Sequence, residues 1–209
     1  MIEQVERVRI KASRVDPIKR IEDIQRLKEY YVSNYRHGEL YELILTLGIN
    51  TGLRAGDLLS LKVGDIRNRT HIEIIEQKTK KPRRIFINKQ VERSVESYLK
   101  RYMFIENHSY LFYGQKGVTL DVRTVHKLVK RGCKELKLDG NYGSHTMRKT
   151  FAYHAYQYSR NLPLIRDLFN HSDTHVTRIY VGNDIENTKD ASKDMIICSE
   201  DEIYQNVNL

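Results

Sequence analysis

Four side chains that can act together on a phosphate lie in one stretch of the C-terminal half: His145, Arg148, His171 and Tyr180. If Gly143-Ser144 caps a helix that begins at His145, the spacing of three residues puts His145 and Arg148 on one helix face. His171 ends a second short amphipathic run, and Tyr180 lies in a third. This combination predicts phosphoryl transfer assisted by cations, with a tyrosine as the nucleophile.

Two basic features upstream have simpler interpretations when each is taken alone. Arg54 follows Thr51-Gly52-Leu53 and precedes a helical run, so it could be a surface arginine at a helix start. Two β-rich runs, 70–77 and 83–87, flank the segment 78–82, which predicts a hairpin with a basic tip. Such a tip is by itself no more than a solvated run of charge.

Together, these features resemble the tyrosine recombinase (phage integrase) family. Its pattern is an arginine after a Thr-Gly-Leu turn, a hairpin lysine, an H-x-x-R pair, a second histidine or tryptophan, and a tyrosine nine residues later. The resemblance covers roughly residues 20 to 182. It implies a mainly α-helical (α+β) catalytic domain with a small antiparallel sheet, the fold of DNA breaking and rejoining enzymes. The catalytic residues that it implies are Arg54, Lys78, His145, Arg148, His171 and the nucleophile Tyr180.

The roles of these groups follow from the resemblance and from their chemistry. A tyrosine has a pKa of about 10, so the phosphate must be made electrophilic and the phenol must lose its proton. The two arginines and His171 would bind the phosphate oxygens, His145 would accept the proton, and Lys78 would protonate the departing 5′ oxygen. The product is a 3′-phosphotyrosyl link, which needs neither metal nor ATP, so we expect no cofactor.

Three positions leave room for interpretation. Asp57 stands where the family more often has glutamate, and we expect it to hold the Arg54 guanidinium in place. Lys80 is the alternative to Lys78 as the catalytic lysine. Asn170 replaces the glycine of the usual Leu-Gly-His and is the best substitute for glycine at a positive φ.

Other reactive residues have plainer explanations. Tyr153, Tyr156 and Tyr158 lie on the H-x-x-R helix and are expected to be core or groove aromatics. His171 and His175 are four residues apart, but two histidines alone are a weak zinc signal, so we predict no metal site. Cys133 and Cys198 lack metal-ligand spacing, which favours a reduced intracellular setting.

Charge points to a polyanion as the partner. With 36 Lys and Arg against 27 Asp and Glu, the net charge is +9, and nucleic acid is the usual partner of such a chain. Residues 121–138 predict a helix with an apolar stripe of Val122, Val125, Val129, Cys133 and Leu136. We expect double-stranded DNA to contact the neighbouring basic stripe and the hairpin tip, although a solvated face gives the same pattern. The expected contacts are Arg123, Lys127, Lys130, Lys134, Lys80, Lys81, Arg83 and Arg84.

The chain, with 209 residues, fits one domain with a tail. We expect an arm or linker at 1–17, the catalytic domain at 18–182, and a tail at 183–209 that docks on a neighbouring protomer. Helical spacing begins at Ile21, and a second helix, from Leu40 to Leu47, is expected to end at Gly48. The expected assembly is a homotetramer on paired DNA sites, to which accessory DNA-bending proteins could contribute. No membrane span or secretory signal is evident, so we predict a cytoplasmic, nucleoid-associated protein.

Larger family members carry a second, N-terminal domain that completes a clamp around DNA. The chain lacks room for it, so we expect either a short recombinase or the catalytic fragment of a longer integrase. Binding should then be modest and strongly dependent on salt. The alternatives are a non-catalytic DNA-binding module with this fold and a type IB topoisomerase, which shares the chemistry.

Overall fold

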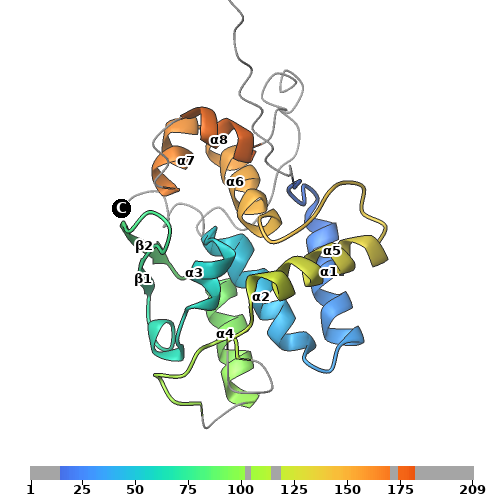
Figure 1. The fold of residues 1–209 in the computed structure, drawn as a ribbon, viewed down its shortest axis with the longest axis vertical. Helices are drawn as coiled ribbons and strands as arrows, with labels where there is room; N and C mark the ends of the chain where they lie inside the picture. Colours follow the sequence, from blue (N-terminus) through green and yellow to red (C-terminus); the bar gives the residue numbers. More distant parts are fainter. Residues whose placement is uncertain (1–14, 102–104, 114–118, 170–173, 182–209) are drawn as a thin grey trace, which may run out of the picture.

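The computed structural model describes residues 15–101, 105–113, 119–169 and 174–181. As expected, this part of the chain is mainly α-helical with one two-stranded antiparallel sheet (Figure 1). Its elements are α1 (Ile21–Asn34), α2 (Gly38–Thr51), α3 (Ala55–Leu59), a 3-10 turn (Val63–Asp65), β1 (His71–Ile75), β2 (Pro82–Phe86), α4 (Lys89–Arg101), α5 (Val122–Glu135), α6 (Thr146–Ser159), α7 (Leu162–Leu168) and α8 (Thr174–Val181). None of the helices in these residues is long and apolar enough to cross a membrane.

Helix α2 is the centre of the main core. It packs against α1, α4 and α6. Because helices surround it, its consecutive residues 43–48 are all buried, whereas a helix at the surface would bury only one apolar stripe. The expected end at Gly48 is wrong, because α2 continues to Thr51 and ends at Gly52, whose φ of 59° is left-handed. Gly48 instead permits close packing: a Cβ there would lie 2.5 Å from Sδ of Met147 on α6.

A smaller core joins the last three helices. Four residues are buried together: Ala152 of α6, Ile165 of α7, Phe169 directly after α7, and Val181 of α8. Figure 1 shows these three helices grouped at one end of the molecule, beyond α2 and α3. This small core places Tyr180, on α8, beside the H-x-x-R helix α6.

The described residues that precede α1 are packed against the rest of the fold. Val15 and Ile18 are buried, and the Ile18 amide donates to Thr150 Oγ1 at 2.9 Å. The Asp16 amide donates to the carbonyl of Asn141 at 2.6 Å. Residues 15–17 are therefore part of the packed fold, whereas residues 1–14 lie outside the described chain.

The hairpin has the expected position with shorter strands. β1 and β2 pair in the register Ile72 with Ile85, and both of these residues are buried. Because side chains alternate along a strand, Arg83 lies on the buried side with Ile85, and Arg84 lies on the exposed side. Lys78 is in the turn between the strands.

Helix α5 has the middle of the predicted core stripe and differs at its two ends, because Leu136 is half-buried and follows the last helical residue. Val125, Val129 and Cys133 are buried, but Val122 is 40% exposed. Val122 is the first residue of the helix, directly after Asp121, whose side chain accepts the Thr124 amide. The core stripe therefore begins one turn later than expected.

Candidate active site

The turn after α2 positions the first arginine. Thr51 Oγ1 donates to the carbonyl of Leu47 at 2.7 Å and accepts the Leu53 amide at 3.3 Å. Gly52 reverses the chain at a positive φ, and a Cβ there would lie 2.5 Å from the ring of Phe151. Arg54, which is half-buried, follows this turn directly and occupies the N-cap position of α3.

Arg148 reaches the same turn from α6. Its side chain is 1% exposed, and Nη1 donates to the carbonyl of Gly52 at 2.6 Å while Nη2 donates to that of Phe169 at 3.4 Å. The negative end of the α2 dipole therefore faces this guanidinium. The two arginines predicted to bind a phosphate are brought together, although they lie far apart in the sequence.

A buried carboxylate connects them to a third arginine. Glu76 Oε2 lies 2.9 Å from Nη1 of Arg54, and Oε1 lies 3.6 Å from Nη1 of Arg83 and 4.0 Å from Nη1 of Arg148. Arg83 also donates to the carbonyl of Thr51 at 2.8 Å. We call Arg54, Arg83 and Arg148 around Glu76 the arginine cluster.

The pKa shifts in the arginine cluster leave Glu76, Arg83 and Arg148 charged at neutral pH. Burial alone would raise the pKa of Glu76, but the hydrogen bond from Thr79 and the charges of Arg54 and Arg83 outweigh it and lower that pKa. Burial, followed by the other two arginines, lowers the pKa of Arg148 to about 9. Three guanidiniums thus face two carboxylates, Glu76 and Asp57, and one positive charge is in excess. The cluster is suited to an anion.

Asp57 has a different main partner from the one expected. Its Oδ2 lies 3.9 Å from Nη1 of Arg54, but Oδ1 accepts the Gln77 amide at 2.8 Å and ties α3 to the hairpin. The closer partner of Arg54 is Glu76, which sequence reasoning missed. The available signal was an acidic residue at the end of the β-run HIEIIE, and it was weak because the same run contains a second glutamate, Glu73.

Arg83 does not belong with the exposed cations of the hairpin tip. Lys80, Lys81 and Arg84 are exposed, as expected for groups that could meet DNA, but Arg83 is 9% exposed and takes part in the arginine cluster. The burial of Arg83 does not favour the predicted contact of this side chain with a DNA phosphate, and that contact stays a prediction. The adjacent Arg84 pairs at the surface with Glu73 at 3.3 Å.

Tyr180 lies against the arginine cluster. Its ring centroid is 5.9 Å from that of Phe169, and Arg148 Cζ lies 5.7 Å from the Tyr180 centroid and 4.2 Å from the Phe169 centroid. The predicted nucleophile and a predicted phosphate-binding arginine are therefore neighbours. The competing tyrosines 153, 156 and 158 are half-buried along α6.

His145 caps α6, which begins at Thr146, one residue later than expected. His145 is an exposed residue, yet neighbouring atoms partly desolvate its ring, and this desolvation lowers its pKa. The positive charges of Arg148, Arg54 and Lys78 lower it further. His145 is accordingly neutral at physiological pH, as a proton acceptor must be.

The two remaining predicted catalytic residues are less defined. Lys78 is exposed in the hairpin turn, near enough for its charge to act on His145. His171 lies outside the described residues. Within the described ranges, no group of three or more His, Cys, Asp or Glu side chains could hold a metal ion.

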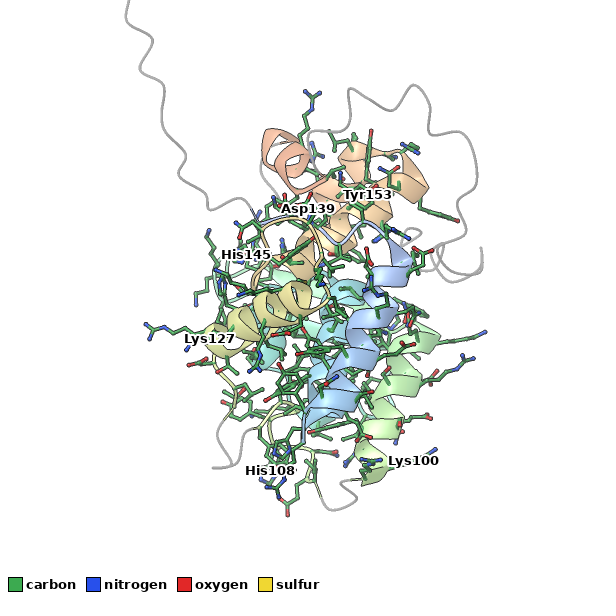
Figure 2. All side chains as sticks on the ribbon, turned by 90° about the vertical axis from the view of Figure 1, so that its right-hand side faces the viewer. Lys100, His108, Lys127, Asp139, His145 and Tyr153 are labelled. Atoms are coloured by element: carbon green, nitrogen blue, oxygen red, sulfur yellow. The ribbon has the colours of Figure 1, made fainter. Side chains whose placement is uncertain are left out.

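The basic stripe of α5 is exposed as predicted, at Arg123, Lys127, Lys130 and Lys134. Figure 2 shows Lys127 projecting from α5 on the same side of the molecule as His145. Lys100, on α4, projects from the opposite side in the same view (Figure 2). The basic stripe of α5 therefore lies on the same side of the molecule as the N-terminal end of α6 (Figure 2). Its contact with DNA stays a prediction.

Known proteins share both the sequence pattern and the fold. The model of the phage integrase family matches residues 19–187. A probable integrase/recombinase YoeC from Bacillus subtilis is 32% identical over 180 residues, which are 86% of this chain and 96% of that protein. The tyrosine recombinase XerC of Caldanaerobacter subterraneus is 30% identical over 152 residues, 71% of this chain and 42% of that one.

Solved structures agree in fold at lower identity. The XerH site-specific recombinase, bound to palindromic difH substrate in a post-cleavage complex, aligns with a TM-score of 0.66 at 23% identity, over 83% of this chain and 51% of that one. A λ integrase dimer bound to a COC′ core site aligns with a TM-score of 0.63 at 16% identity, over 87% and 51%. The chain thus spans about half the length of these solved proteins. By its sequence and its fold, this chain belongs to the phage integrase family of tyrosine recombinases.

Proposed function

We propose that this chain carries the catalytic site of a site-specific DNA recombinase, which cleaves and rejoins strands through a bond between Tyr180 and a 3′ phosphate. The observation that carries the proposal is the meeting of three distant segments: Arg54 and Arg148 lie beside one buried carboxylate, and Tyr180 lies beside Arg148. A packed core has no need to gather three guanidiniums beside a half-exposed tyrosine, because buried charge costs solvation energy.

The arginine cluster suits a phosphodiester in its reacting state. Arg54 and Arg148 carry planar guanidiniums of the shape that matches the non-bridging oxygens of a phosphate. To bind one, Arg148 would exchange its hydrogen bonds to the carbonyls of Gly52 and Phe169 for the phosphate. The excess positive charge of the cluster attracts the diester, and it stabilises the additional negative charge of the transition state more strongly. His171 would add a further hydrogen-bond donor, as the family pattern implies.

The proton transfers are assigned to the two groups that border the cluster. As Tyr180 Oη forms its bond to phosphorus, its proton passes to His145, which is neutral because its pKa is lowered. The bond from phosphorus to the 5′ oxygen breaks, and Lys78 donates a proton to that oxygen. The bond energy stays in the phosphotyrosyl link, so religation to a 5′ hydroxyl requires no ATP, and we assign no role to a metal.

The partner that fits this chemistry is double-stranded DNA, bound along α5 and the hairpin tip. The XerH structure is bound to its palindromic difH substrate and the λ integrase dimer to a COC′ core site, which supports the same kind of partner here. Cleavage of paired sites would need several copies, and we propose a homotetramer with residues 183–209 docking on a neighbour. Removing residues 185–209 should then weaken assembly on DNA without abolishing binding, as measured by sedimentation; unchanged sedimentation would count against the tail.

Covalent trapping tests the function directly. The wild type is incubated with nicked suicide duplexes of randomised sequence in EDTA, quenched in SDS, and digested to map any peptide linked to DNA. Tyr180→Phe removes the nucleophile, and Tyr153→Phe is a matched control on α6. We expect a metal-independent adduct at residue 180 in the wild type and in Tyr153→Phe only. An adduct at another tyrosine, or DNA binding with no adduct, would refute the proposal, and the latter would favour a regulatory DNA-binding module.

A further inference from the structure

Glu76 connects the arginines that are proposed to bind the phosphate with the turn that carries Lys78, the proposed proton donor. It directly follows β1, its side chain is fully buried, and its Oε2 contacts both Arg54 at 2.9 Å and the Thr79 hydroxyl at 2.7 Å. Thr79 is the residue after Lys78. One oxygen atom thus joins a phosphate-binding arginine to the turn that carries the proton donor.

The other oxygen extends this connection to the remaining arginines. Glu76 Oε1 lies 3.6 Å from Arg83 and 4.0 Å from Arg148, and none of the described residues donates a hydrogen bond to it. Arg83 in turn holds the carbonyl of Thr51 at 2.8 Å. The carboxylate therefore interacts electrostatically with all three guanidiniums, and its shortest contact is with Arg54.

The backbone of Glu76 closes the same turn. Its carbonyl accepts the Lys80 amide at 2.9 Å, and its amide donates to the carbonyl of Lys81 at 3.0 Å. The next residue, Gln77, donates its amide to Asp57 on α3. Glu76 thus closes the turn with its backbone and ties it to Arg54 with its side chain, and a longer second link runs from Gln77 through Asp57 to Arg54.

We propose that Glu76 is a positioning residue that couples the Lys78 turn to the arginine pair, so that the proton donor and the phosphate-binding groups are set in one geometry. This inference rests on the proposed function, because it takes Lys78 and the arginines as the acting groups. Glu76 touches neither the phosphate nor the leaving oxygen. A misplacement of catalytic groups by about 1 Å lowers rates by about 100-fold, so such coupling has a measurable consequence.

Tryptic cleavage tests the anchoring without any DNA. Trypsin can cut after Lys78, and the rate of this cut, relative to the cut after Lys100 on α4, reports how firmly the turn is held. Glu76→Gln keeps the shape and removes the charge, and Glu73→Gln makes the same change at an exposed position of β1. We expect the relative rate to rise at least about 10-fold in Glu76→Gln and to stay unchanged in Glu73→Gln. Equal rates in both variants would overturn the inference.

A change in the leaving group tests the coupling to catalysis. With a 5′-bridging sulfur, the departing thiol has a pKa of about 8.5 and leaves without a proton, so the position of Lys78 no longer matters. Thr79→Val removes only the hydroxyl that binds Glu76 and leaves every charge in place. We expect it to slow adduct formation about 10- to 100-fold on ordinary DNA and much less on the sulfur substrate.

Glu76→Gln is expected to be slow on both substrates, because it also loosens the arginines. Equal slowing of Thr79→Val on both substrates, or no slowing on either, would refute the coupling. If the wild type forms no adduct with any duplex, the proposed function fails, whereas the tryptic comparison still decides whether Glu76 anchors the turn.

Discussion

Two adjacent arginines of β2 provide the sharpest test of the arginine cluster. Arg83 and Arg84 are next to each other in the sequence, but Arg83 is buried and Arg84 is 59% exposed in its side chain. Replacing each by methionine removes the same charge and keeps an unbranched apolar stem. We expect Arg83→Met to destabilise the fold strongly and Arg84→Met to leave it almost unchanged.

The contacts set the magnitude. Arg83→Met leaves the carbonyl of Thr51 without its donor, which costs about 1–3 kcal/mol for a buried group. It also removes one of three positive neighbours of Glu76, and breaking a buried ion pair costs about 3–5 kcal/mol. The burial of an apolar side chain in place of a charge offsets part of this cost, so we expect a net loss of about 3 kcal/mol. The surface pair of Arg84 with Glu73 contributes about 0–1 kcal/mol.

Urea denaturation of the wild type and of both variants at pH 7 measures these differences. The free energy of unfolding should fall by about 3 kcal/mol in Arg83→Met with an unchanged slope, and by less than about 1 kcal/mol in Arg84→Met. Losses of similar size in the two variants, or a loss under about 1 kcal/mol in Arg83→Met, would refute the buried role of Arg83.

Three further predictions concern packing, pH and DNA. Gly48→Ala should lower the free energy of unfolding by about 1–3 kcal/mol, because the added Cβ overpacks against α6. Gly56→Ala should leave the fold equally or more stable, because its Cβ would meet only a flexible side chain. Equal shifts of the melting temperature in the two variants would contradict this. Because the folded pKa of Glu76 is lowered from 4.5, its stabilisation is fully present above that pH and is lost as the pH falls through the folded value. The unfolding free energies of wild type and Glu76→Gln should therefore differ most near neutrality and converge in acid; a difference independent of pH would exclude a charge effect. Lys127→Gln should reduce the salt slope of DNA binding by about 0.9, whereas Lys100→Gln on the opposite side should not, as fluorescence anisotropy at several salt concentrations would measure.

Local patterns were enough for much of the architecture. The helical spacing of Ile24, Leu27 and Tyr31 predicted α1 because an amphipathic helix must bury one face, and these residues are buried. Gly48 was misread as a helix end, because a glycine in an apolar run has the same appearance whether it ends a helix or admits a neighbour. Which of these applies depends on α6, nearly a hundred residues away.

The sequence alone determined the family, the expected catalytic groups and the basic character of the chain. The spacing of Arg54, His145 and Tyr180 is a linear property that survives without coordinates. The tertiary structure decided which charges form the site. Adjacent residues of a strand face opposite sides, so whether Arg83 or Arg84 is buried depends on which face of the hairpin meets α2 and α6. Glu76 gains its importance in the same way, because a carboxylate becomes a common partner of three arginines only when three distant segments meet around it.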